Sequence, residues 1–426
     1  MSLAESPRVA PFWAALCLVL AVGIFLRLPA ALFEGQDAPL SSLSLLHPNP
    51  GFTGTGFDEA LYRGYVNQLI RVGLGNYPEI VDHYIAVQKT LVGSILPPMR
   101  FLYIFAAYLW HQLFGTEALA ALHDVASFFS ILALLLATVF AWRLKGPACA
   151  LGVAALVAFA PTQIHMSQHA LVDGFFAFWA IFVLWTFWEN LRAPGDWRWL
   201  LFYSLGLAAM VTTKENAAFV FFALVVLLVA NRWLRWGAVT RELLACTFLG
   251  PLLGVVVLLF LAGGVQTMVT TYQLSVSKNY HLVYAIVTGD GPWHRYLVDL
   301  LLVSPIILLL AIGKIFTLER AQKPELFLAI FVAASYLVMC NLKYGMNLRY
   351  ANMWDLPLRV LAFSQLTALV RPFARYRAVL LAVAVALICL VEMRQYLILF
   401  VNYGLYELVS EGLLRALQIL KSAPAP

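Results

Sequence analysis

Charged residues are scarce in this 426-residue chain: Asp, Glu, Lys and Arg together make up 12% of it, against about 25% in a typical soluble domain. Hydrophobic residues make up 62%, and the mean hydropathy is +0.83. These values exclude an ordinary soluble enzyme and indicate a polytopic membrane protein. The formal net charge of +6 does not predict nucleic-acid binding, because the basic residues stand in short clusters between apolar runs.

Cysteines are also few, and all five (Cys17, Cys149, Cys246, Cys340 and Cys389) stand in apolar stretches. They are expected to be small core residues, with neither a disulfide framework nor a metal site. The sequence contains no Walker loop, dinucleotide fingerprint or zinc-protease motif, which disfavours nucleotide-sugar chemistry. Met1–Arg8 and the apolar run after it lack a convincing cleavage site, so this run is predicted to be a retained first helix.

Apolar runs of nearly 20 residues recur along the chain, and a helix of that length spans a bilayer. We predict an all-α polytopic transmembrane helical bundle, a single integrated domain of about 11 spans with no repeat. The spans are placed at 10–30, 122–142, 148–164, 173–190, 198–213, 215–231, 241–263, 297–313, 325–341, 355–370 and 378–392.

The basic clusters predict the orientation of these spans. They fall in alternate connections, around Arg143, Arg235, Arg320 and Arg375, and cytoplasmic loops are enriched in Lys and Arg. The N-terminus is therefore predicted to lie inside. The short aromatic segment Pro97–Phe114 is predicted to lie in the interface, which makes residues 31–121 one long first outer loop with interfacial helices. Helical spacing of Glu407, Glu411 and Arg415 predicts a C-terminal amphipathic tail over 393–426.

Two adjacent carboxylates, Asp58 and Glu59, follow the first apolar run. Placing acidic side chains at a bilayer costs desolvation free energy, so such residues are commonly catalytic or bind a cation. Asp58 can act as a general base, or it can cap a helix N-terminus. Tyr62 lies one turn after Asp58 and is predicted to share its face. A divalent cation is possible, with Asp58, Glu59 or His169 as candidate ligands, but the sequence establishes no cofactor.

A second acidic position, Asp173, follows His165 and His169 at intervals of four residues. If the segment is one helix, the three side chains form a stripe. The alternatives are a metal site, the polar lining of an outer cavity, and a plain loop; a turn between two spans is expected to interrupt the helix here.

Several cations are predicted on the same outer face and can bind phosphate. Arg349 suits a lipid phosphate because guanidinium binds phosphate oxygens in pairs. Lys214 can alternatively pair with Glu215, and Arg349 or Arg100 can alternatively anchor to lipid headgroups. Further candidates for the substrate cavity are Tyr350 and the segment that contains Trp293, His294 and Arg295. Its aromatic rings can stack on a sugar or belong to the interfacial belt.

Four features in order resemble the GT-C glycosyltransferases, specifically the bacterial protein O-mannosyltransferase and aminoarabinose-transferase group. They are Asp58-Glu59-Ala60 after Arg27, Pro97-Pro98 before Leu113-Phe114-Gly115, Asp173 with Thr213-Lys214-Glu215, and Arg349-Tyr350 before Leu356-Pro357. The resemblance is good over about the first 220 residues and loose over the rest. Ile95-Leu96 stand where the group often has His before Pro-Pro, which puts phosphate contact by this segment in doubt.

The resemblance implies a GT-C fold in the inner (plasma) membrane, with the active site on the periplasmic or outer face. It further implies transfer of a sugar from a polyprenyl-phosphate donor to a lipid, glycan or protein acceptor, with inversion. Asp58, with Glu59 and Asp173, would be the catalytic group, and Arg349, Lys214 and Arg100 would bind the donor phosphate. The competing hypothesis is a transporter or flippase of a lipid-linked glycan, although such folds usually show repeats and charges near the midplane.

Overall fold

The computed structural model describes residues 9–33, 37–47, 56–343 and 345–420, and in these residues the protein is helical, without strands. The longest helix is α6 (Ala118–Lys145). The other α-helices are α1 (Val9–Phe25), α3 (Phe57–Val72), α4 (Tyr77–Thr90), α5 (Phe101–Phe114), α7 (Pro147–Ala158), α8 (Pro161–Ser167), α9 (Val172–Arg192), α10 (Trp197–Thr213), α11 (Ala217–Leu234), α12 (Arg241–Leu261), α13 (Val265–Asn279), α14 (Val283–Gly289), α15 (Arg295–Val303), α16 (Pro305–Phe316), α17 (Lys323–Met339), α18 (Asp355–Leu369), α19 (Arg377–Tyr396) and α20 (Ser410–Ala416). A 3-10 helix, η4 (Leu348–Trp354), precedes α18, and a π-helical segment (Leu397–Asn402) follows α19.

Five described helices are long and apolar enough to cross a membrane: α6, α9, α11, α12 and α19 with its π-helical extension. Helices α7 and α8 form a sixth candidate, bent by 60° at the break between them. The other predicted spans correspond to α1, α10, α15 with α16, α17 and α18, none of which exceeds 17 residues. The all-helical membrane bundle is thus confirmed, and the count of eleven spans stays a prediction.

The break between α7 and α8 is stabilised by a buried arginine from the end of α1. Pro161 begins α8, so among the described residues Ala158 O lacks a backbone partner and Val157 O accepts only the backbone N–H of Ala160, at 3.1 Å. Arg27 donates hydrogen bonds to Val157 O at 2.7 Å and to Ala158 O at 2.9 Å, and its side chain is fully buried. A charged donor therefore replaces the missing backbone donors and fixes α1 against the bend.

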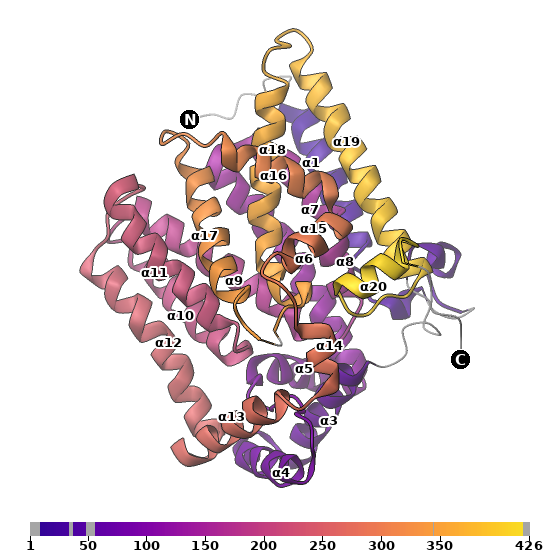
Figure 1. The fold of residues 1–426 in the computed structure, drawn as a ribbon, viewed down its shortest axis with the longest axis vertical. Coiled ribbons are helices and arrows are strands. Elements are labelled where there is room, and N and C mark those ends of the chain that lie inside the picture. The colour runs from indigo at the N-terminus through magenta and orange to yellow at the C-terminus, as the bar shows by residue number, and fades with distance from the viewer. Residues whose placement is uncertain (1–8, 34–36, 48–55, 344, 421–426) are drawn as a thin grey trace.

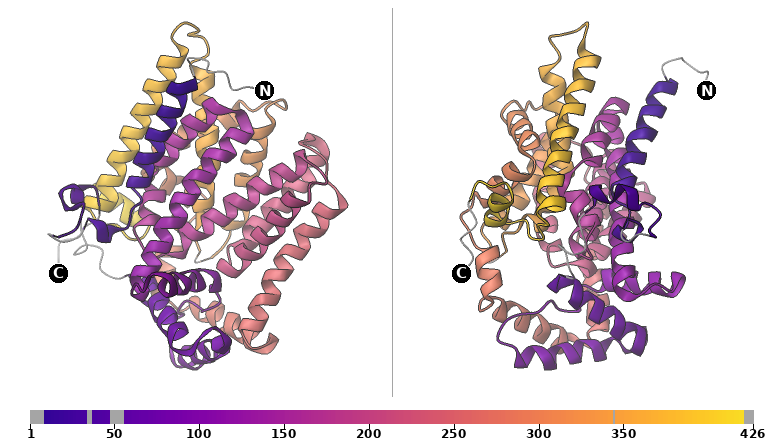
Figure 2. Two further views of the ribbon diagram at one scale, coloured as in Figure 1. Left: turned by 180° about the vertical axis from the view of Figure 1, so that it is seen from behind. Right: turned by 90° about the vertical axis from the view of Figure 1, so that its right-hand side faces the viewer.

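Helices α3, α4, α5 and α13 gather at one end of the bundle, away from the α18–α19 connection (Figures 1 and 2). Helix α5 starts and ends in this layer. Arg100, just before α5, contacts Glu215 of the α10–α11 connection, whereas Glu117, just after α5, pairs with Arg63 of α3 at 2.7 Å. Both ends of α5 therefore contact this end of the bundle, and the interfacial position of Pro97–Phe114 stays a prediction.

The C-terminal segment differs from the predicted amphipathic helix. Helix α19 continues through Tyr396 into the π-helical segment, an irregular stretch ends at Val409, and α20 covers only seven residues. Gly404 has a φ of +64°, which interrupts the helix between Asn402 and Ser410. As a result Glu407 lies in a loop, while Glu411 and Arg415 pair on the surface of α20 at 2.7 Å.

Candidate active site

A cavity of about 360 Å3 lies where the α3–α5 layer meets the bundle and helices α13 and α14. Five of the residues singled out from the sequence line it: Asp58, Arg100, Lys214, Arg349 and Tyr350. The remaining lining is mostly neutral and includes Ser94, Asn216, Tyr272, Ser275, Asn279, Tyr280, Tyr284, Thr288 and Asn347. Polar groups from segments nearly 300 residues apart in sequence thus meet in one concave space.

Asp58 occupies the first turn of α3, where a carboxylate is stabilised by the unpaired N–H groups of the helix. Gly56, not Asp58, is the N-cap, so the capping alternative does not describe the Asp58 side chain. Its Oδ2 accepts a hydrogen bond from Arg349 Nη2 at 3.0 Å. The side chain retains 20% exposure, in contrast to 2% for that of Arg349. Asp58 is therefore an acid that a substrate in the cavity can reach.

Asp173, in the first turn of α9, forms an ion pair with Lys214, which directly follows α10. Both side chains are almost fully buried, at 3% and 2% exposure. Burial lowers the pKa of Lys214 to about 8, although Asp173 opposes this effect by stabilising the charged amine. The amine also lies 4.0 Å from the centre of the Tyr350 ring. Lys214 thus pairs with Asp173 in preference to its neighbour Glu215.

Arg349 is the centre of the charged cluster. Besides its bond to Asp58, its Nε lies 3.3 Å from Glu407 Oε2 and 3.8 Å from Asp173 Oδ2. Burial favours the neutral form, but these three carboxylates raise the pKa of Arg349 well above its usual value. Within the described residues, its buried Nε and Nη1 groups make no hydrogen bond. Nε faces Glu407, whereas Nη1 has neither a hydrogen bond nor an ion pair there. Buried donors are seldom left unpaired, so Nη1 is the group of Arg349 that is available for a ligand.

Arg100 lies opposite, held between α3 and the α10–α11 connection. Its Nη1 donates to Tyr62 Oη at 2.8 Å and its Nε to Glu215 Oε2 at 3.1 Å. The Pro97-Pro98 segment before it is fixed from α3 and α4: Tyr65 Oη donates to Leu96 O and Tyr77 Oη to Pro98 O, both at 2.6 Å. Tyrosines of α3 and α4 thus position the loop that carries Arg100 to the cavity.

Glu59 points away from the cavity and holds the backbone together. Its Oε2 accepts the N–H of Gly56 at 2.9 Å, and its Oε1 accepts the N–H of Ala170 at 2.8 Å and lies 3.1 Å from His169 Nδ1. Burial raises its pKa, but hydrogen bonds from His169 and Gly56 outweigh this and lower it to about 2. Glu59 is therefore an ionised clamp between the start of α3 and the segment before α9.

Four other predicted cavity residues lie elsewhere. His165 is buried in α8, stacks on Phe400 and contacts Tyr406 O at 3.1 Å through Nε2. The helix ends at Ser167, so the proposed stripe of His165, His169 and Asp173 is interrupted. Trp293, His294 and Arg295 lie at the start of α15 outside the cavity lining. Trp293 is 61% exposed, as in the alternative of an interfacial belt, while Arg295 donates to Thr288 O at 2.6 Å.

Glu407 is the site residue that sequence reasoning missed. Besides Arg349, it accepts a hydrogen bond from Asn347 Nδ2 at 2.6 Å and another from Tyr284 Oη. The helical spacing of Glu407 with Glu411 and Arg415 suggested a solvated face. Gly404, three residues earlier, is the one local signal of a loop.

No group of three His, Cys, Asp or Glu side chains in the described ranges is arranged to hold a metal ion. The Asp58 carboxylate faces Arg349, and the Glu59 carboxylate already accepts three hydrogen bonds or close contacts. The oxygens of the two carboxylates therefore do not converge on one position.

Comparison with known proteins gives a family match over residues 76–286, close to half of the chain: dolichyl-phosphate-mannose-protein mannosyltransferase. Solved structures match over nearly the whole chain. The chain is similar to ArnT from Cupriavidus metallidurans, with 16% identity, a TM-score of 0.53, and coverage of 97% of this chain and 76% of ArnT. These likenesses show that the chain has the fold of these membrane enzymes.

A second group of GT-C relatives is longer. The oligosaccharyltransferase of Archaeoglobus fulgidus matches with 13% identity and a TM-score of 0.59, covering 90% of this chain and 56% of the relative. The same archaeal enzyme, AglB, in complex with an inhibitory peptide and a dolichol-phosphate matches with 13% identity, a TM-score of 0.54 and coverage of 91% and 55%. This chain thus spans little more than half the length of those relatives. No curated protein sequence matches it.

Proposed function

We propose that this GT-C protein transfers a sugar from a polyprenyl-phosphate donor to an acceptor hydroxyl, by a single displacement with inversion at the anomeric carbon. The observation that carries the proposal is the cavity in which a reachable carboxylate, Asp58, faces three cations: Arg100, Lys214 and Arg349. One base and one cationic clamp are what this reaction requires. The family match to dolichyl-phosphate-mannose enzymes and the dolichol-phosphate bound by AglB support a lipid-phosphate donor.

Asp58 would accept the acceptor proton. As the acceptor oxygen forms its bond to the anomeric carbon, the bond from that carbon to the phosphate oxygen breaks, and the phosphate departs with the electron pair. The acceptor proton passes to the Asp58 carboxylate, so charge and atoms balance without an enzyme nucleophile. The 20% exposure of Asp58, beside a fully buried Asp173, makes Asp58 the acid available for this role.

Arg349 would bind the donor phosphate through Nη1, which makes no hydrogen bond among the described residues. Lys214 and Arg100 would stabilise the charge on the departing phosphate.

Asp173 and Glu407 would keep the cationic cluster in place in the absence of donor. Asp173 balances Lys214, and Glu407 balances Arg349, so the buried cations do not repel each other. Their removal is expected to affect the arrangement of the clamp more than the proton transfer itself.

We further propose that the cavity opens to the outer face of the inner membrane. Support comes from the basic residues of the α18–α19 connection, such as Arg371, because this connection lies at the opposite end of the bundle from α3–α5 (Figure 1). Single cysteines at Asn76 and Asn279 should react with a membrane-impermeant thiol reagent in intact cells, and one at Gln322 only after permeabilisation. Labelling of Gln322 in intact cells with protection of Asn279 would reverse the orientation.

Mass spectrometry of lipid-linked and surface glycans in a deletion strain tests the function itself. The strain should accumulate a polyprenyl-phosphate sugar and lose one sugar from an envelope glycan, lipid or protein. Wild-type protein should restore the product, whereas Asp58→Asn at equal abundance should not. A strain with unchanged glycans, or full rescue by Asp58→Asn, would contradict the proposal. Rescue by Asp58→Asn would also favour the flippase alternative, which needs no base.

A further inference from the structure

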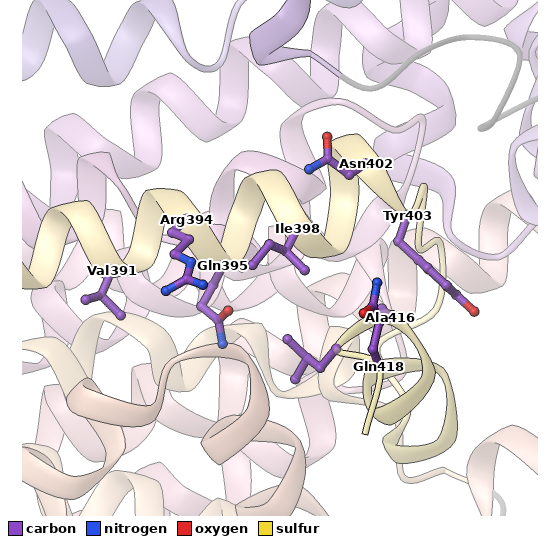
Figure 3. Close-up of a pocket in the computed structure, with 9 residues that line it drawn as sticks. Val391, Arg394, Gln395, Ile398, Asn402, Tyr403, Ala416 and Gln418 are labelled. Carbon is purple, nitrogen blue, oxygen red and sulfur yellow. The ribbon is translucent and has the colours of Figure 1, made fainter. Parts of the chain in front are cut away.

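A second cavity, of about 660 Å3, lies on the other side of the C-terminal segment, between the end of α19 and α20 (Figure 3). Its lining comes from two short stretches of chain: Val391, Arg394, Gln395, Ile398, Asn402, Tyr403, Ala416, Leu417 and Gln418. None of these residues lines the Asp58 cavity. The volume falls within the usual range of ligand sites, roughly 300–1,000 Å3.

Arg394 gives this cavity a positive charge that the described residues do not neutralise. Its guanidinium has no hydrogen-bond or ion-pair partner in the described part of the chain, and the cavity lining contains no acidic residue. The nearest acids in sequence are engaged elsewhere: Glu392 pairs with Arg359 at 2.7 Å, and Glu411 pairs with Arg415. Figure 3 shows Arg394 and Gln395 extending from the same side of α19. The charge is complementary to an anion.

Helix α19 has an apolar stripe on the N-terminal side of Arg394. Val383, Leu387 and Leu390 precede Arg394 at helical spacing, with exposures of 50%, 57% and 66%, and Ile398 continues the stripe above it. Because α19 is long and apolar enough to cross the membrane, this stripe would face acyl chains of the bilayer. A lipid whose headgroup is anionic would cover both parts, because its acyl chain would lie along the stripe while its phosphate meets Arg394.

We propose that this cavity binds the phosphate headgroup of an anionic membrane lipid, with an acyl chain along the apolar stripe of α19. The amide groups of Asn402 and Gln418 at the cavity supply further hydrogen-bonding groups, whereas the Gln395 amide already donates to Leu302 O at 2.8 Å. The two walls are joined by residues 403–409, the loop that carries Glu407 to Arg349. A bound lipid therefore stabilises the loop behind the Asp58 cavity. The proposal does not depend on the transferase assignment.

The test is lipid binding to the full chain purified in a neutral detergent. Native mass spectrometry and thermal unfolding are followed with phosphatidylglycerol, with phosphatidylcholine and with glycerol phosphate. Arg394→Gln should weaken phosphatidylglycerol binding about tenfold or more, as expected for one charge-assisted hydrogen bond, and should remove most of the lipid-induced rise in Tm. Asn402→Trp keeps the charge but fills the cavity, and should have the same effect.

Arg198→Gln is the matched control, because Arg198 is an exposed arginine in the first turn of α10 and lines neither the Arg394 cavity nor the Asp58 cavity. It should leave phosphatidylglycerol binding unchanged. Equal loss in Arg198→Gln and Arg394→Gln would overturn the proposal, since it would indicate general charge attraction. An undiminished affinity in Arg394→Gln and Asn402→Trp would also overturn it. Stabilisation by glycerol phosphate equal to that by the lipid would show that the apolar stripe has no part in binding.

Discussion

The buried pair of Asp173 and Lys214 should make a large, coupled contribution to stability. Both side chains are at most 3% exposed, and loss of one partner leaves the other charge in a low-dielectric interior. Such a loss costs about 3–5 kcal/mol, whereas joint replacement by neutral groups costs much less. We therefore expect Lys214→Met and Asp173→Asn each to be destabilising, with the double variant at least about 2 kcal/mol more stable than the sum of the two effects predicts.

Thermal unfolding of the purified protein measures this coupling. An unfolding entropy of about 2.1 cal/mol/K per residue over 426 residues gives about 0.9 kcal/mol/K, so each single variant should lower Tm by roughly 3–6 °C. The exposed pair of Arg63 and Glu117 is the control, because its atoms are 2.7 Å apart but its side chains are about half exposed. Its coupling should stay below about 1 kcal/mol. Additive effects at Asp173 and Lys214 would refute the account of this pair.

Three further predictions concern the candidate site. Arg349→Lys should retain more donor use than Arg349→Ala but less than wild type, because Lys keeps the charge and loses the paired N–H groups; unchanged donor KM and kcat in both would mean that Arg349 does not bind donor. Glu59→Ala should reduce the free energy of unfolding by about 1–3 kcal/mol and so lower Tm, because the N–H groups of Gly56 and Ala170 lose their acceptor. A wild-type Tm would show that these hydrogen bonds to Glu59 are dispensable for stability. The pKa of Lys214 is lowered to about 8, so the amine is charged below that pH and neutral above it, and kcat/KM should fall above about pH 8. Lys214→Arg should move this alkaline fall of kcat/KM to higher pH. If the fall stays at the same pH in Lys214→Arg, another group causes it.

The helices were predictable because apolar runs and their charged flanks encode them directly. The run 173–190 became α9 (Val172–Arg192), and 241–263 became α12 (Arg241–Leu261). Two breaks were not predicted: the bend at Ala160 before Pro161, and Ser304 before Pro305, which divides the span at 297–313 into α15 and α16. Proline removes a backbone donor at such points, but proline alone does not reveal how sharply a chain turns.

The meeting of Asp58, Asp173, Lys214 and Arg349 was predictable in outline, since topology places their segments at one end of the bundle. Their pairing was not, because a sequence does not specify which acid faces which base. Lys214 stands next to Glu215 in the chain yet pairs with Asp173, while Glu215 pairs with Arg100. The role of Glu407 was hidden for a different reason: helical spacing in the C-terminal segment predicted a regular amphipathic helix where the chain forms a loop.

The most direct test of the central claim is turnover by purified Asp58→Asn with a polyprenyl-phosphate sugar as donor. Asn keeps the shape of the side chain and its place beside Arg349 but cannot accept the acceptor proton. Donor binding and Tm should remain near wild type, while kcat should fall by about 10^2-fold or more, as for loss of a general base. Turnover at the wild-type rate, with donor bound normally, would contradict the assignment of Asp58 as the base.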